Sequence, residues 1–197
     1  MNTLEAIASR RSIRRFKKDP IPREVVERVL AAAVQAPSAK NVQPWRFVVL
    51  EGDRNARLAT IMLDAAQDLK AKGVGIGSLE WTARAMLGAP LTVVVFNVAP
   101  PPDVPEEAHA DWHWVMVQST GAAIQTMLLA AQDLGVGSLW ICDILFAACE
   151  VSEWLGRPDD RIVAAVTLGY ADEAPGPRPR RPWQEVTEWL EPEEASG

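Results

Sequence analysis

Strand-forming segments are few in this chain, and longer helical segments separate them. Runs with the composition of β-strands occur at 46–51, 91–98, 137–142 and 161–169. The run LTVVVFNV at 91–98 is strongly β-branched and predicts the central strand of a sheet. The stretches between the strands have helical spacing, so helices should cover both faces of that sheet. This pattern favours an α+β fold over a doubly wound parallel sheet.

The expected helices are recognised by apolar spacing and by residues typical of helix ends. Asn2 and Glu5 form the pattern of a capping box, and Gly135 is a terminating residue for the longest helix. The prolines of APPPDVPEEAHAD predict an exposed loop at 99–111. The segment GVGIGS at 73–78 lacks the GxGxxG frame, so we interpret it as a hinge between two helices. Helices are expected at 3–10, from Pro22 to before Pro37, and at 54–71, 81–87, 114–134, 147–155 and 183–190.

Length and composition predict one globular domain over residues 1–197. With 48% hydrophobic residues the chain can bury a sizeable core without a metal or a disulfide, and Cys142 and Cys149 lack metal-binding spacing. The first residues lack the apolar core of a signal peptide, and polar residues interrupt the most apolar stretch, Val115–Ala131. We therefore expect a cytoplasmic protein with no membrane partner. The net charge of −6 argues against a nucleic-acid partner.

Arginines are concentrated near the amino terminus of this acidic chain. The segment RRSIRRF at 10–16 contains four arginines around Ser12, whereas the whole chain has 20 Lys and Arg against 26 Asp and Glu. The planar guanidinium group suits bidentate binding of a phosphate, and a neighbouring hydroxyl adds a donor. Taken alone, the segment could equally be a solvated basic helix end.

Residues for proton transfer or nucleophilic attack form no recognisable set. His109 and His113 lie in HADWH, which lacks the glutamate of HExxH, so we interpret them as exposed residues at a helix start rather than as a metal site. Cys142 could face a ligand, but a buried inert thiol is the preferred interpretation. The donors that remain suit a cofactor that performs its own chemistry. They are Arg10, Arg11, Ser12, Arg14, Ser38, Asn41, Gln43, Arg178, Arg180 and Arg181.

Tryptophan is unusually frequent, with eight residues against one tyrosine. Most are expected to pack inside the protein, although flat apolar walls also suit a flat ligand. Gly121, Ala122 and Ala123 lie within the longest expected helix and would allow close approach by another helix.

The chain resembles the nitroreductase-like flavoprotein family in the order and spacing of four motifs. These are RRSIRRF, APSAKNVQPWRFVV, QDLGVGSLW and LGYADE followed by RPRRPW. The resemblance covers nearly the whole chain. It implies a sandwich with a mainly antiparallel central sheet flanked by helices, and a two-fold homodimer with FMN at the subunit interface.

The resemblance also implies roles for particular residues. Arg10 and Ser12 would hold the FMN phosphate, with Arg180 or Arg181 reaching it from the tail. Arg14 would lie by the pyrimidine edge of the flavin, where its charge stabilises the reduced ring. The partner subunit would contribute Pro37, Ser38 and Asn41. The cofactor-binding set implied in this way is Arg10, Arg11, Ser12, Ile13, Arg14, Pro37, Ser38, Asn41, Trp140, Ile141, Cys142, Arg180 and Arg181.

The function implied is transfer of a hydride from NADH or NADPH to a flat electron-poor acceptor such as a nitroaromatic or quinone. The flavin performs the chemistry, so no side chain is expected to act as acid or base. Two alternatives stay open: another flavin reaction on this scaffold, such as ring dehydrogenation or reductive dehalogenation, and a non-catalytic flavin-binding protein. Cys142 and Asp143 stand where some relatives carry Glu-Gly, and the 99–111 loop matches no family pattern.

Overall fold

A computed structural model of the chain describes residues 1–98 and 105–190. Its sheet has the strand order β1-β2-β4-β3, and every neighbouring pair is antiparallel. The expected α+β fold with an antiparallel sheet is confirmed. The strands are β1 (Trp45–Glu51), β2 (Leu91–Asn97), β3 (Gly137–Ile141) and β4 (Arg161–Gly169).

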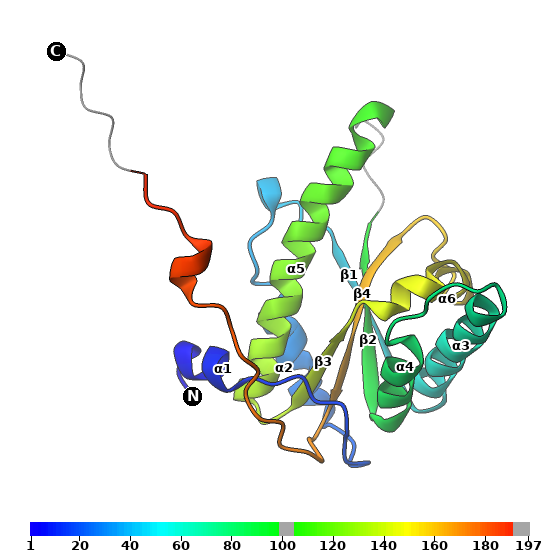
Figure 1. Cartoon of the computed structure of the whole chain (residues 1–197), viewed down its shortest axis with the longest axis horizontal. Coiled ribbons are helices and arrows are strands. Elements are labelled where there is room, and N and C mark those ends of the chain that lie inside the picture. Colours follow the sequence, from blue (N-terminus) through cyan, green and yellow to red (C-terminus); the bar gives the residue numbers. More distant parts are fainter. Residues whose placement is uncertain (99–104, 191–197) are drawn as a thin grey trace.

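Helices form a layer on each face of the sheet (Figure 1). One layer contains α2 (Arg23–Ala33) and α5 (His109–Asp133). The other contains α3 (Gly52–Ala71), α4 (Leu79–Gly88) and α6 (Ala148–Trp154). The segment 73–78 links α3 to α4, which confirms its interpretation as a connection between two helices.

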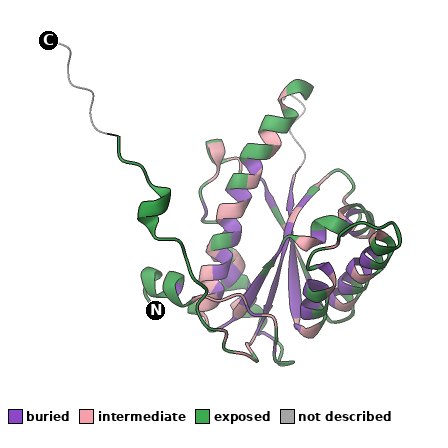
Figure 2. Cartoon of the chain, viewed as in Figure 1, coloured by how far each residue is buried: buried purple, intermediate pink, exposed green. Residues whose placement is uncertain are grey.

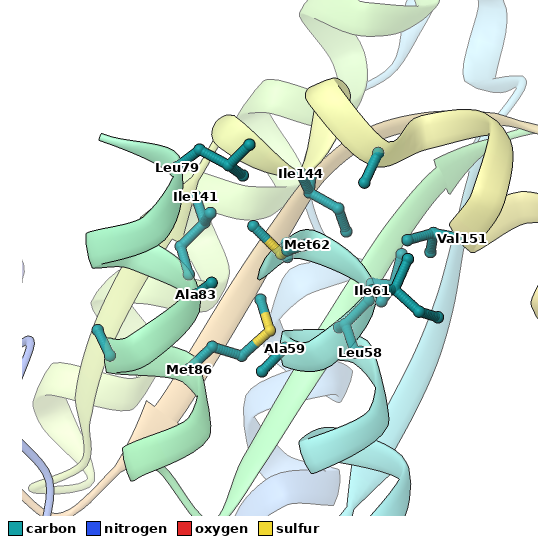
Figure 3. Close-up of a cluster of buried hydrophobic side chains, with 14 of the residues drawn as sticks. Leu58, Ala59, Ile61, Met62, Leu79, Ala83, Met86, Ile141, Ile144 and Val151 are labelled. Carbon is teal, nitrogen blue, oxygen red and sulfur yellow. The ribbon is translucent and has the colours of Figure 1, made fainter. Parts of the chain in front are cut away.

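Strand β2 lies at the centre of both cores, and all of its residues are buried (Figure 2). Successive side chains of a strand point to opposite faces, so Val93 and Val95 pack with α2 and α5. Val94 and Phe96 pack on the other face with α3 and α4. Figure 3 shows part of this second core, where side chains of α3 and α4 meet Ile144 and its neighbours. The expectation of a β-branched central strand is confirmed.

The first helix, α1 (Thr3–Ser9), begins with the expected capping box. The Asn2 side chain accepts a hydrogen bond from the Glu5 N–H at 2.9 Å, and the Glu5 carboxylate accepts one from the Asn2 N–H at 3.0 Å. These two bonds satisfy backbone donors that a helix start leaves free. None of the helices in the described ranges is long and apolar enough to cross a membrane.

Two expected segments differ from the structure. Residues 99–104 of the expected loop lie outside the described residues, but the chain is helical from Glu106 and α5 begins at His109. The proline run ends at Pro105, and Asp111 in the first turn favours a helix start, so the expected loop extended too far. In the tail only Trp183–Val186 forms a short 3-10 turn. A longer helix there would have no apolar surface to pack against, and short isolated helices are marginal.

Tryptophans are mostly exposed, so the expectation that they pack inside the chain is wrong. Of the eight, only Trp45 is buried, whereas Trp112 and Trp154 are partly buried. These exposed tryptophans lie on several different elements, α4, α5, β3 and the tail. The exposed members are Trp81, Trp114, Trp140, Trp183 and Trp189.

Gly169 is required where β4 passes the amino-terminal segment. A Cβ atom at this position would lie 2.7 Å from Phe16 Cδ1 and 2.8 Å from Pro90 Cδ. We expect Gly169→Ala to lower the free energy of unfolding by about 1–3 kcal/mol, because these rings must shift. Urea denaturation measures the change. In the control Gly88→Ala the new Cβ meets nothing within 4 Å, so equal effects of the two substitutions would contradict this packing.

Candidate functional site

The arginine-rich segment 10–17 is attached to the ends of β3 and β4. The Ile13 N–H donates to the Ser138 carbonyl at 2.9 Å, and the Lys17 N–H donates to the Tyr170 carbonyl at 2.8 Å. Arg10 caps the end of α1, and these bonds make the rest of the segment extended, so most of the cluster lies beyond the helix. Ile13 is buried, and its side chain packs close to Gly137. The structure therefore gives Ile13 a packing role in this segment.

A cavity of about 400 Å³ lies between this segment and the tail that follows β4. Its size is within the range of small-molecule sites. The amino-terminal segment and residues 175–180, far apart in the sequence, supply its charged and polar groups. Those groups belong to Arg10, Arg11, Ser12, Arg14, Arg178 and Arg180.

The cavity is strongly cationic, because five arginines line it. In residues 1–98 and 105–190, no carboxylate oxygen lies within 4.0 Å of a charged nitrogen of any cavity arginine. The pKa of Arg10 is lowered, first by burial and then by the positive charges of Arg180 and Arg11. An anion placed among these groups would relieve this repulsion and would accept their hydrogen bonds.

The three arginines of the tail do not all lie at the cavity. Arg178 and Arg180 line the cavity, whereas Arg181 is not among its lining residues. The Arg180 side chain donates to the carbonyl of Pro179 at 3.2 Å. Of the two tail residues implied by the resemblance, Arg180 is therefore the one that the structure brings to the amino-terminal cluster.

Arg14 is held at both its backbone and its side chain. Its N–H donates to the Glu173 carboxylate, and its Nη1 donates to the Ser12 carbonyl at 3.1 Å. The guanidinium carbon lies 4.8 Å from the ring centroid of Trp81. Sequence reasoning assigned no role to Glu173, although it lies in the motif LGYADE, and it missed Trp81, because nothing in the local sequence of Trp81 distinguishes it from a surface residue.

The expected residues Pro37, Ser38 and Asn41 lie away from this cavity, in the turn between α2 and β1. The turn is tightly wound, with positive φ angles of 51° at Lys40 and 57° at Asn41. Ser38 Oγ accepts a hydrogen bond from the Gln43 N–H at 3.0 Å. The turn is thus held by its own hydrogen bonds, and Pro37, Ser38 and Asn41 do not line the cavity of the same chain.

The third expected group, Trp140, Ile141 and Cys142, is at the end of β3. Ile141 is buried in the core beside α3 and α4, whereas Trp140 and Cys142 are exposed. Interpretation of Cys142 as a buried thiol is therefore wrong. Partial desolvation, and then the charge of Asp143, raise the pKa of this thiol, so it stays neutral at ordinary pH.

The small residues of α5 have contacts within the chain. Ala123 is fully buried and packs with Ala36 and Trp45. A Cβ atom at Gly121 would lie 3.9 Å from the Trp140 ring, so this glycine faces β3. The small residues at these positions therefore leave room for tryptophan side chains of the same chain.

His109 and His113 lie in the first turns of α5, as expected for a helix start. In the part of the chain that the structure describes, no group of three or more His, Cys, Asp or Glu side chains could hold a metal ion.

Glu173 gives the site a dependence on pH. Burial raises the pKa of Glu173, but hydrogen bonds from the Arg14 and Arg15 N–H groups, together with both arginine charges, outweigh it and lower the pKa below its usual 4.5. A lowered folded-state pKa stabilises the protein above the unfolded value, and this stabilisation is lost as the pH falls through the folded value. We expect Glu173→Gln to destabilise the protein most at neutral pH and progressively less in acid.

Urea denaturation of the wild type and Glu173→Gln from about pH 3 to 7 measures this difference. Glu150→Gln, on an exposed position of α6, is the matched control. A difference between wild type and Glu173→Gln that stays constant over this range would show that the ionised carboxylate does not hold the segment.

Known proteins share both the sequence and the fold of this chain. The sequence model described as Nitroreductase family matches residues 7–170. A protein of Escherichia coli (strain K12) named as an NAD(P)H nitroreductase, YdjA, is 31% identical over 170 residues, which are 86% of this chain and 88% of that one.

Solved structures agree with the sequence comparison. A BluB-like flavoprotein from Clostridium difficile 630 has a TM-score of 0.80 and 25% identity, covering 97% of this chain and 100% of that one. A nitroreductase from Desulfovibrio desulfuricans, described in complex with FMN, has a TM-score of 0.73 and 30% identity over 98% of this chain and 99% of that one. The motifs, the antiparallel sandwich and these matches together show that the chain belongs to the nitroreductase family.

Proposed function

We propose that this protein is an FMN-dependent oxidoreductase that transfers a hydride from NAD(P)H to a flat, electron-poor acceptor such as a nitroaromatic or quinone. The observation that carries this proposal is the arginine-lined cavity, whose charges have no carboxylate partners in the described residues. An acidic chain that gathers uncompensated arginines needs an anionic ligand. The phosphate of FMN is such an anion.

The relatives support the flavin and the NAD(P)H in this proposal. Proteins that share nearly the full length of this chain are named as NAD(P)H nitroreductases in Escherichia coli and Bacillus subtilis. Similar structures from Desulfovibrio desulfuricans and Desulfitobacterium hafniense are described with FMN. A flavin-dependent NAD(P)H oxidoreductase is therefore the activity that membership of this family supports.

The cavity residues suit a phosphate ester in charge and in geometry. Arg10 and Ser12 would bind the phosphate from the amino-terminal segment, and Arg178 and Arg180 would bind it from the tail. A phosphate monoester carries a charge near −2 at neutral pH, and charge-assisted hydrogen bonds from guanidinium groups are the strong ones. When bound, FMN supplies the hydride-transfer chemistry, and the protein binds and orients it.

Arg14 has the properties required of a residue that stabilises negative charge on the ligand. Its guanidinium makes one hydrogen bond within the described residues, to the Ser12 carbonyl, and no ion pair. The charge is consequently available to a ligand in the same cavity. A fixed positive charge favours the electron-rich state of that ligand over its oxidised state.

Structures with two different descriptions share this fold. The BluB-like flavoprotein matches as well by fold as structures described as nitroreductases. The exposed side chain of Trp140 provides a flat apolar wall, which suits a flat acceptor. The rate at which NAD(P)H bleaches the bound flavin distinguishes the reductase from an enzyme of another flavin reaction and from a protein that only binds flavin. Rapid bleaching supports the reductase, and slow bleaching favours these alternatives.

We further propose a homodimer in which one subunit completes the site of the other. The turn carrying Pro37, Ser38 and Asn41 does not line the cavity of its own chain, so its proposed contact with flavin requires a second copy. The tail supports this, because it leaves the body of the protein (Figure 1) while Trp183 and Trp189 are 59% and 80% exposed. Apolar side chains in that position are stabilised by a partner surface.

Titration with FMN tests the cofactor. The purified protein should be yellow or take up FMN on titration, and Arg10→Ala or Ser12→Ala should weaken binding about ten- to hundredfold, because each removes a charge-assisted contact. Fluorescence quenching of FMN measures the affinity. Arg57→Ala, an exposed arginine of α3, should bind as the wild type does. Protein that takes up no FMN would end this proposal.

Kinetics test whether NAD(P)H and the acceptor use the same exposed face of the flavin. If they take turns, steady-state rates at several acceptor concentrations should give parallel double-reciprocal lines, as expected for ping-pong kinetics. Intersecting lines would indicate a ternary complex and would contradict a shared face.

Light scattering tests the assembly. The flavin-loaded protein should have twice the mass of the 21.6 kDa chain, because a two-fold contact is the commonest way to share a site. Removal of residues 182–197 should shift the equilibrium between dimers and monomers toward monomers. A stable flavin-loaded monomer would contradict the shared site.

A further inference from the structure

The first turns of α4 contact two separate parts of the site. Ser78, Trp81 and Thr82 have the spacing i, i+3 and i+4, which places them on neighbouring positions of one helix face. Ser78 Oγ donates to Asp143 Oδ2 at 2.6 Å, and Thr82 Oγ1 donates to the same oxygen at 2.8 Å. Trp81 lies over Arg14. The helix therefore links the segment after β3 to the arginine cluster.

The position of α4 is fixed by packing on its opposite side. Leu79, Ala83 and Met86 are fully buried against α3 (Figure 3). A helix anchored in this way presents Trp81 on a stiff support, although half of the Trp81 side chain is exposed. Burial of the tryptophan in the core is consequently not the reason for its position.

Trp81 restrains Arg14 without neutralising it. The distance of 4.8 Å from the guanidinium carbon to the ring centroid is within the range of a cation–π contact. A carboxylate in this place would also hold the guanidinium, but its charge would cancel the field that a ligand experiences. Glu173, the nearby carboxylate, instead binds the backbone N–H groups of Arg14 and Arg15 and pairs with the Arg15 side chain.

A second observation indicates that Arg14 is positioned for a ligand. Its Nε atom is buried and has no hydrogen-bond acceptor in the described residues. A buried unpaired donor costs stability, and such groups persist where function requires them. The side chain is therefore kept at a cost, with its charge unpaired.

We propose that Trp81 is a positioning residue that holds the guanidinium of Arg14 in the flavin site without pairing it with a negative charge. This inference rests on the proposed FMN function and assigns a further residue to it. Trp81 acts through Arg14, so its effect should appear mainly in the preference of the protein for reduced over oxidised FMN. Loss of the aromatic face should let the guanidinium move away from the ligand.

The test compares Trp81→Leu, Trp81→Phe and the control Leu87→Ala, an exposed apolar position of the same helix. The affinity for oxidised FMN and the flavin midpoint potential together give the ratio of affinities for reduced and oxidised FMN. We expect this ratio to fall about three- to tenfold in Trp81→Leu, less in Trp81→Phe, and not in Leu87→Ala. Thermal melting of the flavin-free proteins checks that the variants are folded.

A double-substitution cycle shows whether Trp81 acts through Arg14. In an Arg14→Met background, Trp81→Leu should cause no further fall in the ratio. An unchanged ratio in the single Trp81→Leu variant, or an equal fall with and without Arg14, would overturn the inference while FMN binding by the wild type leaves the proposed function intact. Failure of the wild type to bind FMN would remove both.

Discussion

The backbone attachment of residues 10–17 to the ends of β3 and β4 supports everything else in the site. Arginines that lie close together repel one another, and in an unconstrained segment they would separate. Here the hydrogen bonds of Ile13 and Lys17 to Ser138 and Tyr170 fix the segment against a sheet. The buried side chains of Ile13 and Phe16 add packing to those bonds. The rigidity of the sheet thus offsets electrostatic repulsion in the cavity.

The carboxylate nearest to Arg14 in this region, Glu173, hydrogen-bonds the backbone and forms no ion pair with a cavity arginine within the described residues. Glu173 accepts hydrogen bonds from the N–H groups of Arg14 and Arg15 and pairs with the side chain of Arg15, which is not among the residues that line the cavity. Trp81 holds Arg14 through an uncharged ring. A site arranged in this way retains its positive charge for a ligand. Because the arginines of the cavity form no ion pairs in the described residues, a protein with a net charge of −6 can bind an anionic cofactor in this cavity.

Local patterns in the sequence were sufficient for the capping box of Asn2 and Glu5 and for the buried strand β2. The antiparallel order of the sheet was predicted correctly from the resemblance to the family. The motif RRSIRRF also indicated the cationic cluster. Its partners Arg178 and Arg180 reach it only because β4 ends beside the segment, which is a property of the fold.

The errors arose where long-range contacts decide the outcome. Exposure of the tryptophans could not be inferred from composition, since an aromatic residue is stabilised equally by a core, a ligand or a partner. The helix expected at 114–134 begins earlier in the structure, at His109. The prolines up to Pro105 disfavour a helix only close to themselves, and the expected loop extended their effect to residue 111. Trp81 was not identified, because its contact with Arg14 joins residues distant in the sequence.

Comparison of FMN with riboflavin tests the central claim most directly, because the two ligands differ only by the phosphate. If the uncompensated arginine cavity binds that group, the protein should bind FMN at least about a hundredfold more tightly than riboflavin, since several charge-assisted contacts are lost together. The difference should shrink in Arg10→Ala, which lacks one of these contacts. Equal affinities for the two ligands, measured by isothermal titration calorimetry, would contradict the assignment of the cavity to the phosphate.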